Sequence, residues 1–236
     1  CLALESTIHE SSVRGIKGFL KKLFLSRISI AFVSGSLHKC LLDKLNYKGE
    51  VKITKGVGII NRPDRNFTKK VYKKRFIFIG RLSKVKNINM LVDLFNSLEE
   101  YMLTIIGVGP LEQELKNKAN DNVIFKGQIM NDNLKENFEK NDILILPSVS
   151  ETWGLVVEEA LYFRTPVIVS SCCGVSELVK DGINGYVFEQ EDSKKLKEII
   201  LGINDRIYNS LIEGVDKFSV DKKDLDQVKS YDIQQG

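Results

Sequence analysis

The chain has 236 residues and a formal net charge of +4, and 43% of its residues are hydrophobic and 28% charged. These values predict a packed core of one large domain or about one and a half ordinary ones, and they exclude a disordered or collagen-like chain. No apolar run approaches the ~18–20 residues that a membrane-spanning helix needs. The first ten residues have neither the basic nor the apolar segment of a signal peptide, and they lack an initiator Met, so we expect a piece of a longer chain.

The cysteines and the basic residues bear on the location of the protein and on its partners. The four cysteines form no CxxC pair, so neither a disulfide framework nor a zinc site is expected. This cysteine usage is typical of a protein of the reducing cytoplasm. Residues 11–40 contain six Lys and Arg and no acid, and a second basic cluster occupies residues 62–75. These clusters are either solvated helix and linker surfaces or contacts to anionic lipid head groups or a phosphorylated substrate. Nucleic acid is not expected, since neither cluster has the aromatic pattern that base stacking requires.

Short β-branched runs alternate with longer amphipathic stretches, and from Phe76 onward the order is strictly strand then helix. This alternation predicts an α/β fold with a parallel sheet covered by helices on both faces. Several runs are apolar throughout, as expected for strands that are buried on both sides. The predicted strands are Ile28–Val33, Phe76–Gly80, Met102–Gly107, Val123–Lys126, Ile143–Leu146, Val167–Ser170 and Tyr186–Phe188. The predicted helices are Gly15–Leu25, Leu37–Leu45, Ile88–Leu98, Leu111–Ala119, Asn133–Lys140, Gly154–Phe163 and Ser193–Leu201.

The order of the predicted strands and helices divides the chain into four segments. Residues 1–65 hold two basic helices around a single strand, too little to close a sheet, so we expect the end of a larger domain with partly uncovered helix faces. Residues 66–75 are polar and basic and are predicted to be a linker. Residues 76–203 form a complete Rossmann-like domain, and residues 204–236 form a helical tail whose packing the sequence does not place.

Unusual residues lie where predicted strands end and helices begin, which is where open α/β sheets bind ligands. Arg81 and Lys86 follow one strand, and a diphosphate would satisfy both cations. Taken alone, this pair is more often two solvated surface cations. The segment Gly107-Val108-Gly109-Pro110 lacks the third glycine and the acid of a dinucleotide fingerprint, so by spacing alone it indicates an ordinary turn.

A helical wheel separates two adjacent glutamates of the helix that begins near Gly154. Glu159 falls on an otherwise apolar stripe, whereas Glu158 falls at its edge and is expected to lie outside the ligand crevice. A carboxylate in an apolar position needs a partner, and a vicinal diol can donate to it from both hydroxyls. Glu151 is expected to point into the same crevice from the preceding loop. The alternative for Glu159 is a structural pair inside the domain.

Taken together, these segments resemble a known family. FIGRLSKVKN, IIGVGP, VIFKGQI and LPSVSETWGLVVEEALYFRTPVIVSSCCGVSELVKDGINGYVF are similar to the C-terminal half of retaining GT-B glycosyltransferases of family 4. The resemblance covers about residues 28–203 and is most specific from Glu151 to Gly185. It implies a GT-B fold in which residues 1–65 are the remnant of the acceptor domain and residues 76–203 bind the nucleotide-sugar donor.

The resemblance also implies roles for individual residues. Arg81 and Lys86 would hold the donor diphosphate, Glu159 the ribose hydroxyls, and Glu151 would face the transferred sugar. The remaining implied donor contacts are Gly80, Gly107, Gly109, the Gln128-Ile129 turn for the base, and the backbone N–H groups of Gly154, Leu155 and Val156. The family's usual glycine pair is Cys173-Gly174 here, which is a departure from the pattern.

The implied reaction moves a sugar from a nucleotide diphosphate to a hydroxyl with retention, and the leaving phosphate accepts the proton. No cofactor or metal is expected, since His9 and His38 are the only histidines and form no metal-ligand pattern. The resemblance implies a saccharide or lipid-linked acceptor in bacterial surface polysaccharide or glycolipid synthesis. The cysteines predict a cytoplasmic location, and the basic residues 11–40 predict a peripheral one on the inner face of the membrane. The donor half alone is expected to be inactive. The alternatives are a non-catalytic nucleotide-sugar binding module and a sugar-nucleotide 2-epimerase. The Glu151-to-Glu159 spacing argues against the epimerase.

Overall fold

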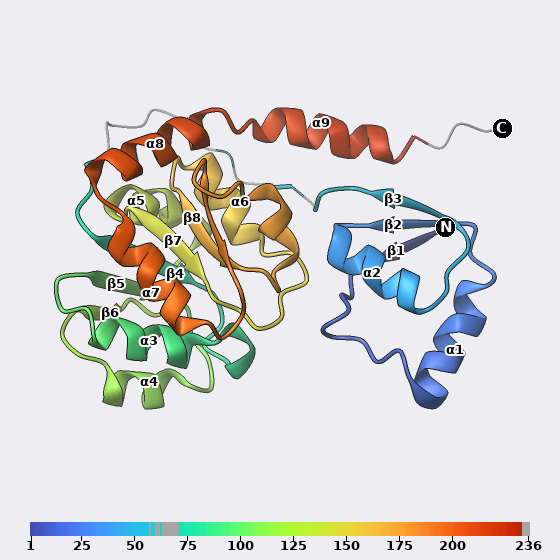
Figure 1. The fold of residues 1–236 in the computed structure, drawn as a ribbon, viewed down its shortest axis with the longest axis horizontal. Helices are drawn as coiled ribbons and strands as arrows, with labels where there is room; N and C mark the ends of the chain where they lie inside the picture. The colour runs from blue at the N-terminus through green and yellow to red at the C-terminus, as the bar shows by residue number, and fades with distance from the viewer. Residues whose placement is uncertain (57, 60–61, 63–70, 233–236) are drawn as a thin grey trace.

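The computed structural model describes residues 1–56, 58–59, 62 and 71–232, and its elements form two lobes (Figure 1). The N-terminal lobe, residues 1–56, has a parallel sheet in the order β1-β2-β3. Its elements are β1 (Leu2–Leu4), α1 (Gly15–Leu25), β2 (Ile30–Val33), α2 (Ser36–Lys44) and β3 (Glu50–Ile53). The prediction of one strand in this segment was therefore wrong. The two missed strands are only three and four residues long and are not fully buried, so they lack a clear apolar signal.

The large lobe, residues 71–218, is built on a six-stranded parallel sheet in the order β6-β5-β4-β7-β8-β9. Its strands are β4 (Arg75–Ile79), β5 (Met102–Ile106), β6 (Val123–Phe125), β7 (Ile143–Leu146), β8 (Val167–Ser170) and β9 (Gly185–Phe188). The chain runs outward from β4 to β6 and then returns to β7 on the other side of β4. This reversal creates a switch point at the carboxyl ends of β4 and β7, where such sheets bind ligands.

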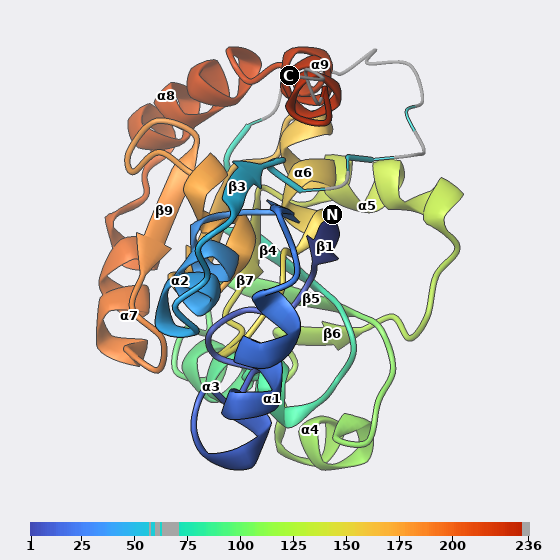
Figure 2. The ribbon, with the colours of Figure 1, turned by 90° about the vertical axis from the view of Figure 1, so that its right-hand side faces the viewer.

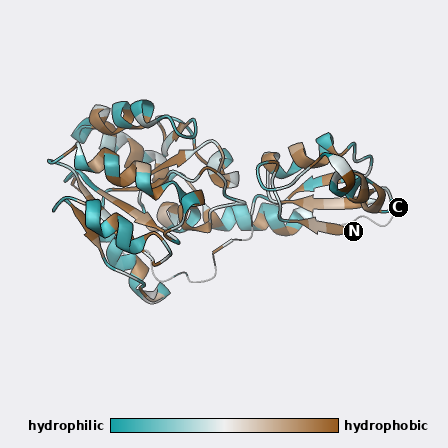
Figure 3. Ribbon diagram, turned by 90° about the horizontal axis from the view of Figure 1, so that it is seen from below, coloured by the Kyte–Doolittle hydropathy of each residue, from teal (hydrophilic) through white to brown (hydrophobic). Residues whose placement is uncertain are grey.

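Helices cover both faces of this sheet, as the alternating pattern predicts. They are α3 (Ile88–Asn96), α4 (Glu112–Lys118), α5 (Leu134–Lys140), α6 (Leu155–Tyr162), α7 (Ser193–Gly202) and α8 (Asp205–Asp216), with short 3₁₀ turns η1 (Lys84–Lys86), η2 (Asn131–Asn133) and η3 (Gly174–Leu178). The strands are brown along most of their length when coloured by hydropathy, and the outer helix faces are teal (Figure 3). Phe76, Ile77 and Phe78 of β4 are fully buried, because helices shield the sheet on both sides. The predicted α/β fold is confirmed.

The C-terminal segment joins the two lobes. Helix α9 (Val220–Ser230) leaves the large lobe and runs along the molecule to the N-terminal sheet (Figure 1). The side chains of Asn204 and Ser219 cap the N-termini of α8 and α9, each by accepting the backbone N–H of the third residue of its helix. At the far end, Tyr231 packs against Phe32 of β2, with ring centroids 5.0 Å apart. The tail is thus helical as predicted, and its end packs on the N-terminal lobe, which the sequence did not place.

Helix α1 leaves most of its apolar side chains uncovered, as expected for residues 1–65. It lies at the outer side of the N-terminal lobe (Figures 1 and 2). Gly18 and Leu25 are its buried residues, whereas its large apolar side chains are 50–79% exposed; they are Ile16, Phe19, Leu20, Leu23 and Phe24. The N-terminal lobe nevertheless has a small core of its own around β2 and α2. Of the predicted linker, residues 66–70 lie outside the described residues.

Candidate functional site

A cavity of about 500 Å³ opens at the carboxyl ends of β4 and β5. It brings together seven of the twelve residues predicted for the site, namely Gly80, Arg81, Gly107, Gly109, Gln128, Ile129 and Glu159. The residues that sequence reasoning missed are Ile79, Ile106, Val108, Asn131 and Leu134. The first two end their strands, so the position of a strand end was the signal that could have identified them. Asn131 and Leu134 directly follow the predicted Gln128-Ile129 turn.

The glycine loops behind this cavity pack backbone against backbone. Gly107 has a φ of +129°, and a Cβ atom there would lie 1.9 Å from the carbonyl oxygen of Gly80. Only glycine combines this backbone conformation with such a close approach. The loops after β4 and β5 are therefore in direct contact, and backbone atoms form part of the cavity wall. This geometry gives the glycine segment more than the ordinary turn that its spacing indicates.

Glu159 is the carboxylate of the cavity. It is half-buried on α6, and its side-chain oxygens have no hydrogen bond or ion pair with any residue that the structure describes. Burial, and secondarily the adjacent Glu158 carboxylate, raise the pKa of Glu159. A buried carboxylate without a partner is unfavourable, so this position is suited to a ligand that donates hydrogen bonds. The structural pairing considered as its alternative is absent among the described residues.

The other predicted site residues lie beside the cavity rather than in its lining. Lys86 and Glu151 form an ion pair with each other, and their side chains are 19% and 16% exposed. The sequence placed an anion between Arg81 and Lys86 and placed Glu151 in the crevice with Glu159. Glu151 does not line the cavity with Glu159 but contacts Lys86, and the binding of a diphosphate by Arg81 and Lys86 stays a prediction. Arg81 is exposed at the cavity and has no carboxylate partner in the described part of the chain.

Gly154, Leu155 and Val156 form the start of α6 and also lie outside the cavity lining. The loop that leads into α6, residues 151–154, is hydrogen-bonded through its backbone to the loop after β8. Cys172 O accepts the Glu151 N–H at 3.3 Å, Glu151 O accepts the Gly174 N–H at 3.0 Å, and Trp153 O accepts the Val175 N–H at 2.9 Å. The departure at Cys173-Gly174 therefore falls in a segment whose backbone holds the loop of Glu151.

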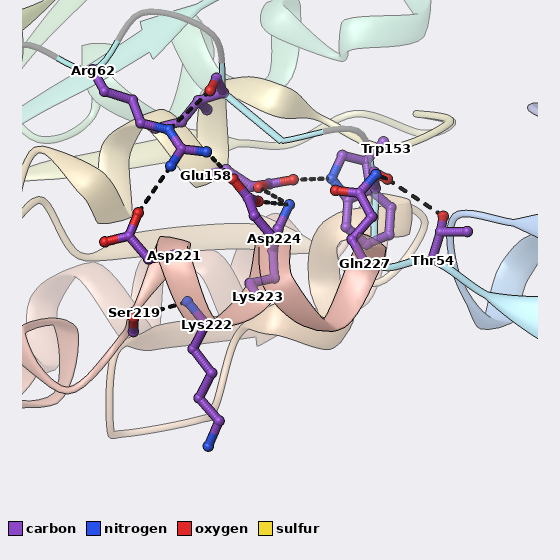
Figure 4. Close-up of polar contacts among 12 residues, drawn as sticks. Thr54, Arg62, Trp153, Glu158, Ser219, Asp221, Lys222, Lys223, Asp224 and Gln227 are labelled. Carbon is purple, nitrogen blue, oxygen red and sulfur yellow. Dashed lines mark hydrogen bonds and ion pairs between the residues drawn. The ribbon is translucent and has the colours of Figure 1, made fainter. Parts of the chain in front are cut away.

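Glu158 lies away from the cavity, as predicted, but its surroundings differ from the prediction. The wheel placed it at the edge of the apolar stripe, whereas its side chain is fully buried. It accepts hydrogen bonds from the Trp153 indole and the Lys223 ammonium (Figure 4). The wheel could not anticipate this burial, because α9, which supplies Lys223, covers that side of α6.

No three His, Cys, Asp or Glu side chains converge as metal ligands in the described part of the chain. The absence of a metal in the reaction stays a prediction. No helix of the described chain is both long and apolar enough to cross a bilayer.

The chain is similar to known proteins in both sequence and structure. The family described as "Glycosyl transferases group 1" matches residues 61–206, more than half of the chain. An uncharacterized 41.2 kDa protein in the cps region of Klebsiella pneumoniae is 27% identical over 205 residues, covering 82% of this chain and 57% of that protein. A Campylobacter jejuni GalNAc-alpha-(1->4)-GalNAc-alpha-(1->3)-diNAcBac-PP-undecaprenol alpha-1,4-N-acetyl-D-galactosaminyltransferase is 31% identical over 198 residues, covering 77% of this chain and 54% of that protein.

Solved structures show the same fold. HepE from Anabaena, solved in complex with UDP and glucose, superposes with a TM-score of 0.71 at 17% identity, covering 97% of this chain and 70% of that one. The GT-B fold expected from the sequence is confirmed. The chain spans little more than half the length of the two curated relatives. It belongs to the group 1 glycosyl transferases.

Proposed function

We propose that the cavity at the ends of β4 and β5 binds the nucleotide-diphosphate sugar donor of a retaining, family 4 glycosyltransferase. The observation that carries this proposal is the convergence of the exposed cation Arg81, the glycine loops and the unpartnered Glu159 on one cavity. Its volume of about 500 Å³ lies within the ordinary range for small-molecule sites. HepE, which shares this fold, was solved with UDP and glucose.

Each group of the site has a role in this proposal. Arg81 binds the diphosphate with its planar guanidinium, and Glu159 accepts hydrogen bonds from the ribose diol. The Gln128-Ile129 turn contacts the base. The diphosphate attracts Lys86 away from Glu151, so that Glu151 becomes available to the transferred sugar. As the bond to the sugar breaks, charge develops on the leaving phosphate, and Arg81 and Lys86 stabilise it. The leaving phosphate accepts the acceptor's proton, so the mechanism requires neither a carboxylate nucleophile nor a metal.

The proposed acceptor is a saccharide or lipid-linked hydroxyl in bacterial surface polysaccharide or glycolipid synthesis. The Campylobacter relative is named for a PP-undecaprenol-linked acceptor, and the Klebsiella relative is encoded in a cps region. We further propose that α1 binds the anionic inner face of the membrane. Its exposed apolar face is accompanied by Lys17 and Lys22, and an amphipathic basic helix of this kind suits a membrane surface.

Nucleotide titration tests the proposed donor site. We expect Glu159→Ala to weaken UDP binding about ten- to a hundred-fold, since a hydrogen bond to a charged group contributes roughly 1.5–3 kcal/mol. Calorimetry with UDP, GDP and ADP would measure the loss and identify the preferred base. Glu213→Ala, which removes an exposed carboxylate from α8, is the matched control and should bind like the original chain. Equal binding by the Glu159 variant would contradict the assignment.

A further inference from the structure

Glu158 joins the loop just before its own helix to helix α9, which lies 65 residues farther along the chain. Its Oε1 atom accepts the Trp153 indole N–H, and its Oε2 atom accepts from the Lys223 ammonium (Figure 4). The side chains of Glu158 and Lys223 are 0% and 4% exposed. A loop residue, a helix α6 residue and a helix α9 residue therefore share one dry polar contact. Each oxygen of the carboxylate has a different donor, so the side chain is held in one orientation.

The ion pair is poorly explained by stability alone. Desolvating two charges offsets most of what their attraction contributes, so a buried ion pair is weak evidence for a stabilising role. Removing only one partner, in contrast, leaves an uncompensated buried charge. Here that charge would lie one residue from Glu159, which lines the cavity. Lys223 is itself part of a wider network, since Asp224 lies 3.3 Å from its ammonium and also pairs with Arg62.

Trp153 connects this contact to the loop of Glu151. Its ring is buried, and its backbone oxygen accepts the Val175 N–H at 2.9 Å. It also packs on Gly56 so closely that a side chain at that position would collide with the indole. Gln227, one turn along α9 from Lys223, donates to the backbone oxygen of the same Gly56. Helix α9 thus reaches the Trp153 indole by two routes.

We propose that Glu158, neutralised by Lys223, is a positioning residue that holds Trp153 and thereby the loop of residues 151–154. Helix α9 acts as a brace for the donor site, although it contributes nothing to the cavity lining. The loop carries Glu151 and ends at the N-terminus of α6, so its position sets where Glu151 and Lys86 meet. This proposal rests on the proposed donor site for its binding readout, but not for its loop readout.

Trp153 is the only tryptophan of the chain, so its fluorescence reports this contact directly. The test compares Lys223→Met, Glu158→Gln and the double variant Glu158→Gln/Lys223→Met. The first leaves a buried carboxylate without its cation, and the second leaves the ammonium without its anion. The double variant removes both charges while keeping an oxygen that accepts from the indole.

We expect each single variant to weaken UDP binding about tenfold, shift the Trp153 emission and speed amide exchange at residues 151–154. The double variant should recover binding to within about threefold.

Asp216→Asn is the matched control for a purely structural effect. It removes the anion of the Arg164–Asp216 pair, which anchors α8 with contacts of 2.6 and 2.7 Å and lies outside the cavity lining. It should lower the melting temperature without changing Trp153 emission or UDP affinity. Single variants that only lower the melting temperature, as this control does, would overturn the proposal. If the original chain fails to bind UDP, the donor-site assignment fails, while emission and loop exchange still decide the role of Glu158.

Discussion

Glu159 carries a carboxylate into a half-buried position where no described residue supplies a cation. Its pKa is raised by burial and by Glu158. The folded chain therefore binds the Glu159 proton more tightly than the unfolded chain does. A raised pKa makes the contribution of this group to stability complete below the ordinary glutamate pKa and lost as the pH rises through the folded value. At neutral pH, Glu159 lowers the stability of the fold, as expected of a group kept for a ligand.

Glu159→Gln should therefore stabilise the protein at pH 7.5. We expect a gain of about 0.5–2 kcal/mol, the range typical of relieving a functional compromise, which corresponds to a few degrees in Tm for a chain of this size. The gain should shrink as the pH falls to about 3, below the ordinary glutamate pKa of about 4.3, where both states of the original chain are protonated. Thermal melts across this pH range, with Glu213→Gln as the control for an exposed carboxylate, provide the measurement. A Gln variant that melts below the original chain at pH 7.5 would refute the argument.

The two adjacent glutamates show how far sequence reasoning reaches at single residues. The wheel assigned Glu159 to the cavity correctly, because the periodicity of a helix fixes which face a residue occupies. It could not identify the burial of Glu158, because Lys223 lies 65 residues away and its approach depends on how α9 docks. Sequence reasoning also assigned Lys86 to the diphosphate and Glu151 to the transferred sugar, and it did not anticipate that the two side chains pair with each other.

Among elements, every strand of the large lobe was predicted from the sequence, whereas β1 and β3 of the N-terminal lobe were missed. Ile143–Leu146 and Val167–Ser170 were predicted with correct bounds, because both strands are apolar throughout and fully buried. Strand β3, Glu50–Ile53, lies partly exposed and carries the charged residues Glu50 and Lys52. These charges interrupt the apolar pattern from which a strand is predicted. Helix α1 was predicted with its observed bounds, and its uncovered apolar face agrees with the partly uncovered helix faces expected for residues 1–65.

That uncovered face leads to a prediction for α1. Replacing Phe19 and Phe24 by Ser should reduce binding to anionic phosphatidylglycerol vesicles at least tenfold, because each buried Phe contributes roughly 1.5–3 kcal/mol. Raising the salt concentration should weaken the binding of the original chain, because ions screen Lys17 and Lys22 from the lipid charge. Vesicle co-sedimentation measures both effects. Leu225→Ser/Val228→Ser removes an equally exposed apolar pair from α9, where acids accompany the lysines, and should have little effect. Binding to neutral and anionic vesicles alike would exclude the electrostatic part of the proposal.

In the whole molecule, two hydrogen bonds join the lobes directly, in addition to the contacts that α9 makes with both. The N–H of Ser36, at the N-terminus of α2, donates to the Glu177 carboxylate of the large lobe at 2.9 Å. The N-terminus of a helix favours negative charge, because its first N–H groups lack partners and its dipole is positive there. Nearby, Ser150 of the large lobe donates to Glu10 at 3.3 Å. Glu177 follows the loop that holds residues 151–154, so this contact links lobe orientation to the vicinity of the proposed donor site.

Glu177→Gln should loosen the lobes without changing the donor cavity. The amide keeps an oxygen for the Ser36 N–H but loses the charge, so we expect a loss of about 0.3–1 kcal/mol in stability and faster amide exchange in the first turn of α2. Small-angle scattering should show a larger radius of gyration, and Glu213→Gln should leave it unchanged. UDP affinity should stay within twofold, because Glu177 does not line the cavity. An unchanged radius together with unchanged exchange in α2 would show that α9 alone sets the orientation of the lobes, whereas a large loss of affinity would mean that the N-terminal lobe helps to shape the donor site.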